Sequence, residues 1–461
     1  MKPLFKNQTQ SIGLMINAPC FFDQSEPGTG KTRVQIEMIR RISEADPKHR
    51  ALVTATLSTT TSAWLNDFQQ FAPDLKVVVA LSPKLSERFN TPADVYITNH
   101  DSVKWLADPE NKAVLRNCFG NYATVVHDES TVFKHHTSQR SKAAKVLTKY
   151  FARRRNLSGL ADPNGLTDLW HQYFLLDDGK RLGPSFSKFQ HAFYSPKRVW
   201  VNNTKCVNEW TENPNAARII SQLTKDITIK HKLAECQDIP ENFVYERAVP
   251  LPPKLQKLYR KFTQDLVVEI GGKELMALNK AVLRGKLLQF AAGSFYNEGE
   301  SSHSVIDSGR RDFILDLVQE VKHSIVFFLW KHQRDELVAG AQKRGLRFAV
   351  YDGETRPSER NRITEQYQNG ELDTIFAYPQ AAAHGLTWVR GTRCIWASPT
   401  DNFEWWVQGN RRIYRTGQTQ RTETIVVYAP DTYDENCITN LTGKKFRSNL
   451  YDDMLAKALA S

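Results

Sequence analysis

Hydrophobic positions along the chain gather in short runs, each of which is followed by a longer segment with helical spacing. The runs are rich in β-branched residues and are apolar at successive positions, which is typical of parallel strands that helices bury on both faces. In the first half of the chain the runs lie at 51–55, 76–80, 94–98 and 123–126. In the second half they lie at 324–328, 347–351, 374–377, 394–397 and 424–428. Two such sets predict an α/β protein with two doubly wound parallel-sheet lobes.

The stretch between the two sets of strands has a different pattern. Residues 160–310 hold long amphipathic segments interrupted by prolines, so we expect helical insertions and a linker there. We place the boundary between the lobes near Ile239 and Pro240. The predicted domains are a first lobe at 1–238, with a helical insertion at about 165–238, and a second part at 239–461, in which a linker or helical insertion precedes the second lobe at about 311–461.

Composition narrows the class of protein. The 461 residues are enough for two to four domains at about 150 residues per domain. Six cysteines are scattered without a Cys-x-x-Cys pair, which favours a reducing cytosol over a disulfide scaffold. The apolar runs are of strand length and the N-terminus lacks a signal-peptide pattern, so we expect a cytoplasmic protein without a membrane span. The net charge of +12 leaves an anionic partner open.

Residues 25–32 have the pattern of a phosphate-binding loop, with serine at the usual first glycine. Its glycines let backbone N–H groups close around phosphates, and the helix that begins directly afterwards points its N-terminus at the anion. We expect Lys31 to reach the β and γ phosphates and Thr32 to coordinate magnesium. A glycine-rich turn that happens to precede Lys-Thr is the alternative. The candidate nucleotide-binding residues in the loop are Glu26, Pro27, Gly28, Thr29, Gly30, Lys31 and Thr32.

Two adjacent carboxylates, Asp128 and Glu129, follow the predicted strand at 123–126. The carboxyl end of a parallel strand faces the ligand crevice of such a fold. We therefore assign Asp128 as the magnesium partner and Glu129 as the base that orients water for attack on the γ-phosphate. A pair of this kind on its own is more often a solvated end of a strand, but here it follows a phosphate-binding loop within one lobe.

The third catalytic element is predicted at 408–418 in the second lobe. On a helix, Gln408, Arg412 and Arg415 would share one face. Planar guanidinium groups aimed at a γ-phosphate stabilise the charge that develops during transfer. A basic helix surface is the alternative interpretation.

Together these residues resemble the motifs of the Swi/Snf-type ATPases, helicase-like proteins of superfamily two that translocate on double-stranded DNA. The segment at 175–183 is similar to compact members found in phages and prophages. The resemblance implies two RecA-like lobes of the P-loop NTPase type, ATP and Mg as cofactors, and a bacterial or host cytosol. It also implies that Gln8 reads adenine and that Ser158 and Gly159 couple hydrolysis to DNA movement. The matching blocks are 4–8, 51–57, 64–79, 94–101, 128–134, 141–143, 157–159, 163–170, 352–360, 384–386, 408–418 and 432–434.

The resemblance implies a double-stranded DNA partner that is held by its backbone, independently of sequence and with strong salt dependence. Lys134 and Lys142 belong to a run that extends to Arg155 and contains eight basic residues and no acidic one. We count both as candidate phosphate contacts, although a solvated helix face is the alternative. The contacts that the resemblance places at strand ends along the cleft are Thr56, Leu57, Ser58, Thr98, Asn99, Trp330, Lys331, His384 and Gly385.

The leading functional hypothesis is an ATP-driven translocase on double-stranded DNA that remodels DNA or protein–DNA complexes. One alternative is a strand-separating or branch-migrating helicase on forked DNA or RNA. Another is a degenerate ATPase that serves as a DNA-binding or interaction scaffold. Only one departure favours the scaffold: Leu160 and Ala161 stand where the family usually has Thr-Pro.

Overall fold

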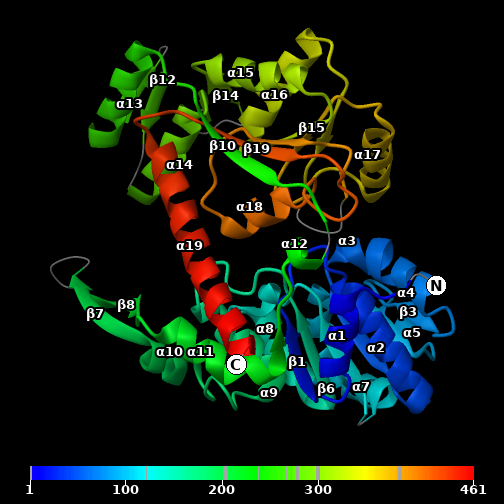
Figure 1. Ribbon diagram of the computed structural model, residues 1–461. Helices are drawn as coiled ribbons and strands as arrows, with labels where there is room; N and C mark the ends of the chain where they lie inside the picture. Colours follow the sequence, from blue (N-terminus) through cyan, green and yellow to red (C-terminus); the bar gives the residue numbers. More distant parts are fainter. Residues whose placement is uncertain are drawn as a thin grey trace. The chain divides into compact units, whose positions relative to one another are not determined.

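The computed structural model describes the chain apart from residues 1–2, 121, 201–205, 237, 266, 271–272, 277–279, 297–301, 383–386 and 461. The chain divides into two compact units, one formed by residues 1–238 together with 446–461 and the other by residues 239–445. Each unit contains a parallel β-sheet with helices packed against it (Figure 1). The predicted α/β class with two doubly wound parallel sheets is therefore confirmed.

The sheet of the first unit has seven strands in the order β3-β4-β2-β5-β6-β1-β9, and each strand runs parallel to its neighbours. Because the strands are parallel, the loops at their carboxyl ends meet along one edge of the sheet. The strands are β1 (Cys20–Asp23), β2 (Ala51–Ala55), β3 (Val77–Val79), β4 (Val95–Asn99), β5 (Thr124–His127), β6 (Arg153–Leu157) and β9 (Thr228–Ile229).

Helices cover both faces of this sheet. Along β2, Ala51 and Val53 join the apolar cluster that includes Trp64 and Phe68, whereas Leu52 joins a second cluster with Leu115. This alternation explains why the predicted run at 51–55 is apolar at successive positions. The helices of the first unit are α1 (Lys6–Met15), α2 (Lys31–Ala45), α3 (Leu57–Thr59), α4 (Asn66–Phe71), α5 (Leu85–Phe89), α6 (Val103–Leu106), α7 (Lys112–Phe119), α8 (Gln139–Leu147), α9 (Thr167–Asp177), α10 (Phe186–Phe193), α11 (Ala216–Thr224) and α12 (Leu233–Cys236).

Strand β6 lies in the centre of the sheet, yet the hydrophobic pattern does not predict it, because three of its five residues are arginines. Arg155 is 1% exposed. Its guanidinium donates to the main-chain oxygens of Met15, Ala18 and Pro19, at 2.9, 2.6 and 3.1 Å. Burial of this arginine is tolerated because these carbonyl oxygens replace the water that it loses.

The insertion at 165–238 is not purely helical, contrary to the sequence prediction. It contains an antiparallel hairpin, β7 (Tyr194–Trp200) and β8 (Cys206–Glu212), which projects from the first unit (Figure 1). It also contains β9, which pairs with β1 at the end of the main sheet. The hairpin lacks a hydrophobic signature because most of the β8 side chains are exposed to solvent.

The sheet of the second unit has six parallel strands in the order β10-β19-β18-β15-β17-β16. Its strands are β10 (Asn242–Ala248), β15 (Ser324–Phe327), β16 (Phe348–Tyr351), β17 (Thr374–Ala377), β18 (Arg393–Trp396) and β19 (Thr422–Tyr428). Two short hairpins accompany it, β11 (Val267–Ile270) with β12 (Lys273–Met276), and β13 (Ser294–Tyr296) with β14 (His303–Val305). The helices are α13 (Pro253–Asp265), α14 (Lys280–Ala291), α15 (Gly309–Glu320), α16 (Lys331–Lys343), α17 (Pro357–Asn369), α18 (Phe403–Asn410) and the start of α19 (Tyr433–Ala460).

The predicted linker or helical insertion after residue 239 is corrected by the structure. It begins with β10, which pairs with β19 from Asn242 opposite Thr422 to Ala248 opposite Tyr428. Sequence reasoning missed β10 because this strand lies at the edge of the sheet and most of its side chains are exposed. Among the described helices of both units, none is long and apolar enough for a membrane crossing.

The C-terminal segment 446–461 belongs to the first unit, whereas the sequence division placed all of 239–461 in the second part. Tyr451 and Leu455 of α19 are buried in the apolar cluster that also contains Tyr173. The Ser448 hydroxyl donates to Asp162 Oδ1 at 3.0 Å. Polar side chains thus anchor the segment inside an otherwise apolar interface.

Asp162 carries a testable consequence for stability. The pKa of Asp162 is raised to about 7, chiefly by burial and also by the nearby Asp452 carboxylate. Lys230 and the hydrogen bond from Ser448 act in the opposite direction. Because this folded-state pKa lies above the unfolded value, the folded protein binds the proton more tightly, and stability falls as pH rises from about 4 to 7.

We expect Asp162→Asn to raise the free energy of unfolding at pH 8 by up to about 4 kcal/mol, from about 1.4 kcal/mol for each pKa unit, because the amide carries no charge to desolvate. The gain should vanish at pH 4. Denaturant unfolding at both pH values measures it, with the exposed Asp74→Asn as the control. Equal destabilisation of Asp162→Asn at both pH values would contradict the assignment.

Candidate nucleotide site

The loop 25–32 leads into the N-terminus of α2, as the sequence predicts, and it follows β1, which is not predicted from the sequence. Gly28 and Gly30 adopt φ values of 91° and 86°, in the left-handed region that glycine enters without strain. A Cβ on Gly30 would lie 2.1 Å from Gln8 Nε2. Gln8 thus packs directly on Gly30, and the two glycines give the loop before the helix N-terminus a backbone conformation suited to binding phosphate.

Lys31 lies across this loop. Its Nζ donates to the main-chain oxygen of Ser25 at 2.5 Å, and the Ser25 N–H in turn donates to Asp23 Oδ1 at 3.0 Å. The Thr29 hydroxyl donates to the main-chain oxygen of Glu26 at 2.8 Å. The ammonium is thus held over the loop, within reach of a phosphate that the loop would bind.

Gln8 of α1 packs against the phosphate-binding loop. Its side chain is 4% exposed, its Oε1 accepts from the Phe5 N–H at 2.9 Å, and its Nε2 donates to Gly30 O at 3.5 Å. The neighbouring Asn7 donates to Thr29 O at 3.1 Å. From the sequence, only Gln8 within the block 4–8 is assigned a role, and Asn7 is not identified as a contact of the loop.

Asp128 and Glu129 follow β5 directly, as predicted. The Asp128 N–H donates to Thr54 O, at the end of β2, at 2.9 Å. Glu129 adopts φ 48° and ψ 54°, a left-handed conformation that costs a non-glycine residue energy and often marks a functional position. Burial lowers the pKa of the adjacent His127 to about 3, so this imidazole stays neutral behind the carboxylates.

Ser158 lies against the end of β1, and Gly159 lies against the phosphate-binding loop that follows it. The Ser158 N–H donates to Asp23 O at 3.1 Å. A Cβ on Gly159 would lie 2.5 Å from Cδ and 2.8 Å from Cγ of Pro27. The structure therefore brings the predicted coupling residues directly against the predicted nucleotide site.

Gln172 joins two of these loops, and sequence reasoning did not identify it. It is fully buried on α9. Its Oε1 accepts from the Ser130 hydroxyl at 2.7 Å, and its Nε2 donates to Ala161 O at 2.7 Å. The loop that carries Asp128 is thereby tied to the loop in which Leu160 and Ala161 depart from the family pattern. The sequence pattern around Gln172 did not point to these contacts, because the residues that it binds lie far from it in sequence.

In the second unit, Gln408 lies on α18, but the predicted helix through Arg412 and Arg415 is wrong, because α18 ends at Asn410. Arg412 and Arg415 lie in the turns that follow. The Arg412 side chain folds back, and its Nε donates to Gln408 O at 2.8 Å. Burial lowers the pKa of Arg415 from its ordinary value. The guanidiniums are thus positioned by turns rather than by helical spacing.

The candidate DNA contacts of the first unit differ in accessibility. Leu57, at the start of α3, is 63% exposed, and Ser58 is also exposed, while Thr56 and Asn99 are partly exposed. Thr98 is fully buried, and its hydroxyl donates to Ala80 O at 2.6 Å. The structure therefore leaves the two strand-end loops accessible while the Thr98 side chain is used inside the lobe.

The basic residues of the run at 134–155 differ in exposure and in pairing. Lys142 is exposed on α8 and Lys134 is partly exposed. By contrast, Arg154 pairs with Asp178 at 2.8 Å, and Arg155 is buried in β6 as described above. Part of the charge that the sequence left available for DNA thus stabilises the first unit.

In the second unit, Lys331 begins α16 and pairs with Glu354 at 2.8 Å, both side chains being 68% exposed. The Lys331 N–H donates to the Tyr296 hydroxyl at 3.1 Å, and Trp330 is partly exposed. His384 and Gly385 lie outside the described residues.

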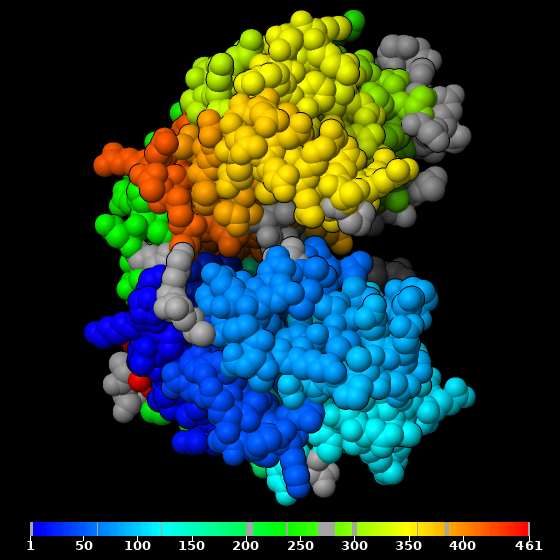
Figure 2. All heavy atoms as spheres, turned by 90° about the vertical axis from the view of Figure 1, so that its right-hand side faces the viewer, coloured from blue at the N-terminus to red at the C-terminus, as the bar shows by residue number. Residues whose placement is uncertain are grey.

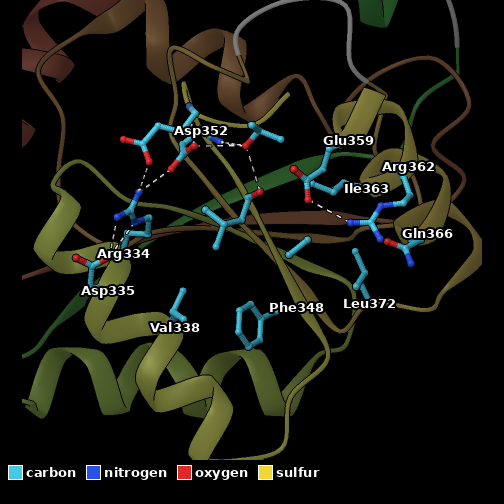
Figure 3. A pocket seen from close by; sticks show the side chains of 14 residues that line it. Arg334, Asp335, Val338, Phe348, Asp352, Glu359, Arg362, Ile363, Gln366 and Leu372 are labelled. Carbon is cyan, nitrogen blue, oxygen red and sulfur yellow. Dashed lines mark hydrogen bonds and ion pairs between the residues drawn. The ribbon is translucent and has the colours of Figure 1, made fainter. Parts of the chain in front are cut away.

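A cavity of about 640 Å³ lies in the second unit between α16 and α17, over the edge strand β16 (Figure 3). Its charged side chains are paired with one another, as in Arg334 with Asp352 at 2.9 Å and Arg362 with Glu359 at 3.1 Å. None of the predicted site residues lines it.

Among the described residues, no group of three or more His, Cys, Asp or Glu side chains is arranged to hold a metal ion, so a magnesium site would need phosphate oxygens as additional ligands.

The contact between Gly159 and Pro27 leads to a test. We expect Gly159→Ala to weaken nucleotide binding by about tenfold or more, because overpacking by one methyl displaces surrounding backbone at a cost of about 1–3 kcal/mol. Equilibrium binding of a fluorescent ATP analogue measures the effect. Gly13→Ala is the matched control, because a Cβ at Gly13 in α1 meets nothing within 4 Å. Unchanged affinity in Gly159→Ala would contradict a tight contact.

Comparisons with known proteins identify the family of the chain. The chain matches the SNF2-related domain over residues 20–300 and the helicase conserved C-terminal domain over residues 309–417. It is 26% identical over 457 residues to protein p41 of Acyrthosiphon pisum secondary endosymbiont phage 1, covering 94% of this chain and 93% of the phage protein. It is 22% identical to an ATP-dependent helicase of Mycoplasma pneumoniae, covering 89% of this chain but 38% of that protein.

A solved structure, the Sulfolobus solfataricus SWI2/SNF2 ATPase core in complex with dsDNA, is 19% identical, with a TM-score of 0.43 and coverage of 99% of this chain and 94% of that one. The SNF2-related match alone spans more than half of the 461 residues, and the helicase C-terminal match follows it in the second unit. The chain belongs to the SNF2-related family and is an ATP-hydrolysing, helicase-like enzyme.

Proposed function

We propose that this enzyme acts on DNA as an ATP-driven translocase on the double strand, remodelling DNA or protein–DNA complexes. One observation carries the proposal furthest: the coupling residue Gly159 packs on Pro27 of the phosphate-binding loop. A change in that loop when nucleotide is bound or hydrolysed must therefore move the segment that the family uses to couple hydrolysis to DNA movement.

The residues present fit ATP with magnesium. The glycine conformations at 28 and 30 open the loop for phosphates, and Lys31 is already held over it. Thr32 and Asp128 would hold the metal, which supplies positive charge to the phosphate oxygens when bound. Glu129 would orient the attacking water, and Arg412 and Arg415 would stabilise charge that develops on the γ-phosphate.

Double-stranded DNA is the proposed partner. The accessible loop ends at Leu57, Ser58 and Asn99 and the exposed Lys142 offer polar, main-chain and cationic groups for the backbone of DNA. Figure 2 shows the blue to cyan part of the chain, which includes these loops, forming the surface of the first unit on the side in view. Such contacts predict binding that is independent of sequence and falls steeply with salt.

Strand separation is the second candidate function, and the β7–β8 hairpin favours it. Residues 195–198 of β7 and 206–209 of β8 are exposed, and Lys197 and Arg198 add positive charge. An exposed hairpin is a shape suited to wedging between strands at a fork. The scaffold alternative has less support, since all the catalytic residue types expected of the family are present.

We expect duplex DNA to stimulate ATP hydrolysis, because the DNA-contact loops follow β2, which pairs with the strand before the catalytic carboxylates, and β4, which lies one strand further away. Lys31→Ala and Glu129→Gln should abolish turnover, since they remove the phosphate cation and the base. Glu129→Gln should still bind ATP. Steady-state phosphate release with and without duplex DNA measures the effect, with Glu44→Gln on the exposed end of α2 as a charge-matched control. Hydrolysis that does not respond to duplex DNA would refute the DNA assignment.

Translocation and strand separation are distinguished by substrate. We expect the enzyme to displace the third strand of a triplex, because a motor on the double strand pushes off whatever lies in the groove, and to leave a forked duplex intact. Gel analysis of both substrates with ATP measures the outcome. Fork unwinding that is lost when residues 197–209 are replaced by a short turn would favour the helicase instead.

A further inference from the structure

Two loops of the first unit converge on Asp128. They follow β2 and β4, and in the sheet order β4-β2-β5 strand β2 lies next to the strand that precedes Asp128, while β4 lies one strand further away. One buried ring from each segment forms a hydrogen bond to this residue. Trp64 comes from the segment after β2 and His100 from the segment after β4. Neither ring is among the residues assigned to nucleotide, magnesium or the attacking water.

The Trp64 indole donates from Nε1 to Asp128 Oδ2 at 2.8 Å. Trp64 is fully buried, and an indole N–H is a donor only, so it needs an acceptor inside the lobe. The other carboxylate oxygen, Oδ1, accepts from the Glu129 N–H at 3.1 Å. The orientation of the carboxylate that would hold magnesium is thus determined in part by a side chain from a neighbouring loop.

His100 holds the backbone of the same residue. Its Nε2 lies 2.8 Å from Asp128 O, and because a carbonyl oxygen only accepts, this nitrogen carries the proton. The ring is 5% exposed and packs edge-on against Phe133, with centroids 5.5 Å apart. Side chain and main chain of Asp128 are therefore each held from a different loop.

The same two loops present accessible groups at their other ends. In the loop after β2, Leu57 and Ser58 are exposed, six to seven positions before Trp64. In the loop after β4, Asn99 directly precedes His100 and is partly exposed. A displacement of Asn99 by a bound backbone would be transmitted directly to the next residue, His100, and a displacement at 57–58 would pass along the helical segment to Trp64.

The connection in the first loop is a π-helical turn, Thr60–Leu65, between α3 and α4. Such turns contain wider hydrogen-bonded rings than an α-helix and are frequent at functional sites. Trp64 lies in this turn, while Phe68 one turn later is buried in the same cluster. Trp64, which donates to Asp128, thus lies in this wide turn, and the exposed residues 57–58 lie at the N-terminal end of the same helical segment.

We propose that Trp64 and His100 are positioning residues that make the geometry of the metal-binding carboxylate of Asp128 depend on DNA contact at 56–58 and at Asn99. The inference rests on the proposed function, because it assigns DNA to these loops. It deepens that function by naming the path from DNA to the hydrolytic site, and it also states a DNA-independent consequence: without either hydrogen bond, Asp128 binds magnesium less tightly.

Trp64→Phe tests the first link, since phenylalanine keeps an aromatic ring but has no N–H. We expect the magnesium concentration for half-maximal binding of a fluorescent ATP analogue to rise by about tenfold, the lower end of the effect of outer-shell partners on metal affinity. Stimulation of hydrolysis by duplex DNA should fall in the same variant, while DNA affinity measured without nucleotide stays at the wild-type value. Trp105→Phe is the matched control, because its ring stacks on Phe89 in the other apolar cluster of the lobe.

His100 provides a second arm, should Trp64→Phe fail to fold as judged by its thermal melt. His100→Phe should raise the magnesium requirement, and His100→Gln, which restores an N–H donor, should recover the wild-type value. A magnesium requirement that is unchanged in both Trp64→Phe and His100→Phe, or that rises equally in Trp105→Phe, overturns the proposal.

The two hypotheses fail separately. If duplex DNA does not stimulate the wild-type enzyme, the proposed function fails, while the magnesium titration still decides whether Trp64 and His100 position Asp128. If DNA stimulates the wild type and stimulates Trp64→Phe and His100→Phe to the same degree, the proposed function stands and the transmission path is overturned.

Discussion

Main-chain hydrogen bonds at the carboxyl edge of the first sheet are the constraint on which the nucleotide site depends. The N–H of Ser158 donates to Asp23 O, that of Asp128 to Thr54 O, and that of Gln24 to Ile229 O, at 3.1, 2.9 and 2.8 Å. Each bond extends the parallel ladder by one residue beyond the strands. The loops after β1, β5 and β6 are therefore each fixed to a neighbouring strand before any side chain contributes.

Buried polar groups in both units are neutral or paired, as the low polarity of the interior requires. His127 is uncharged behind Asp128, and Arg155 is surrounded by main-chain oxygens. In the second unit Arg310 pairs with Asp434, and the same carboxylate accepts from the Ala429 N–H at 2.9 Å. The family block at 432–434 thus has a structural use: it closes the turn after β19 and neutralises a buried arginine.

Much of the core was predictable because its strands are apolar on both faces. The runs at 51–55, 94–98 and 374–377 correspond to β2, β4 and β17. Prediction failed for strands that are polar or exposed, and also for the buried β1 and β9, which have only four and two residues. Strand β6 contains Arg153 to Arg155, whose environment only the neighbouring α1 provides, and the exposed β10 and β7–β8 bury too little on either face to leave a hydrophobic signature.

The sequence by itself identified the residues of the candidate site, because a phosphate-binding loop and an Asp-Glu pair are local patterns whose residue types limit what they can bind. Tertiary structure alone decided which other side chains contact these residues. Gln172, Trp64 and His100 reach Asp128 or its loop across 28 to 64 positions in sequence, and no local pattern encodes such contacts. It also decided that Arg412 and Arg415 lie in turns, since the end of α18 at Asn410 depends on how the chain packs after the helix. Spacing along a chain specifies a face only while the helix continues.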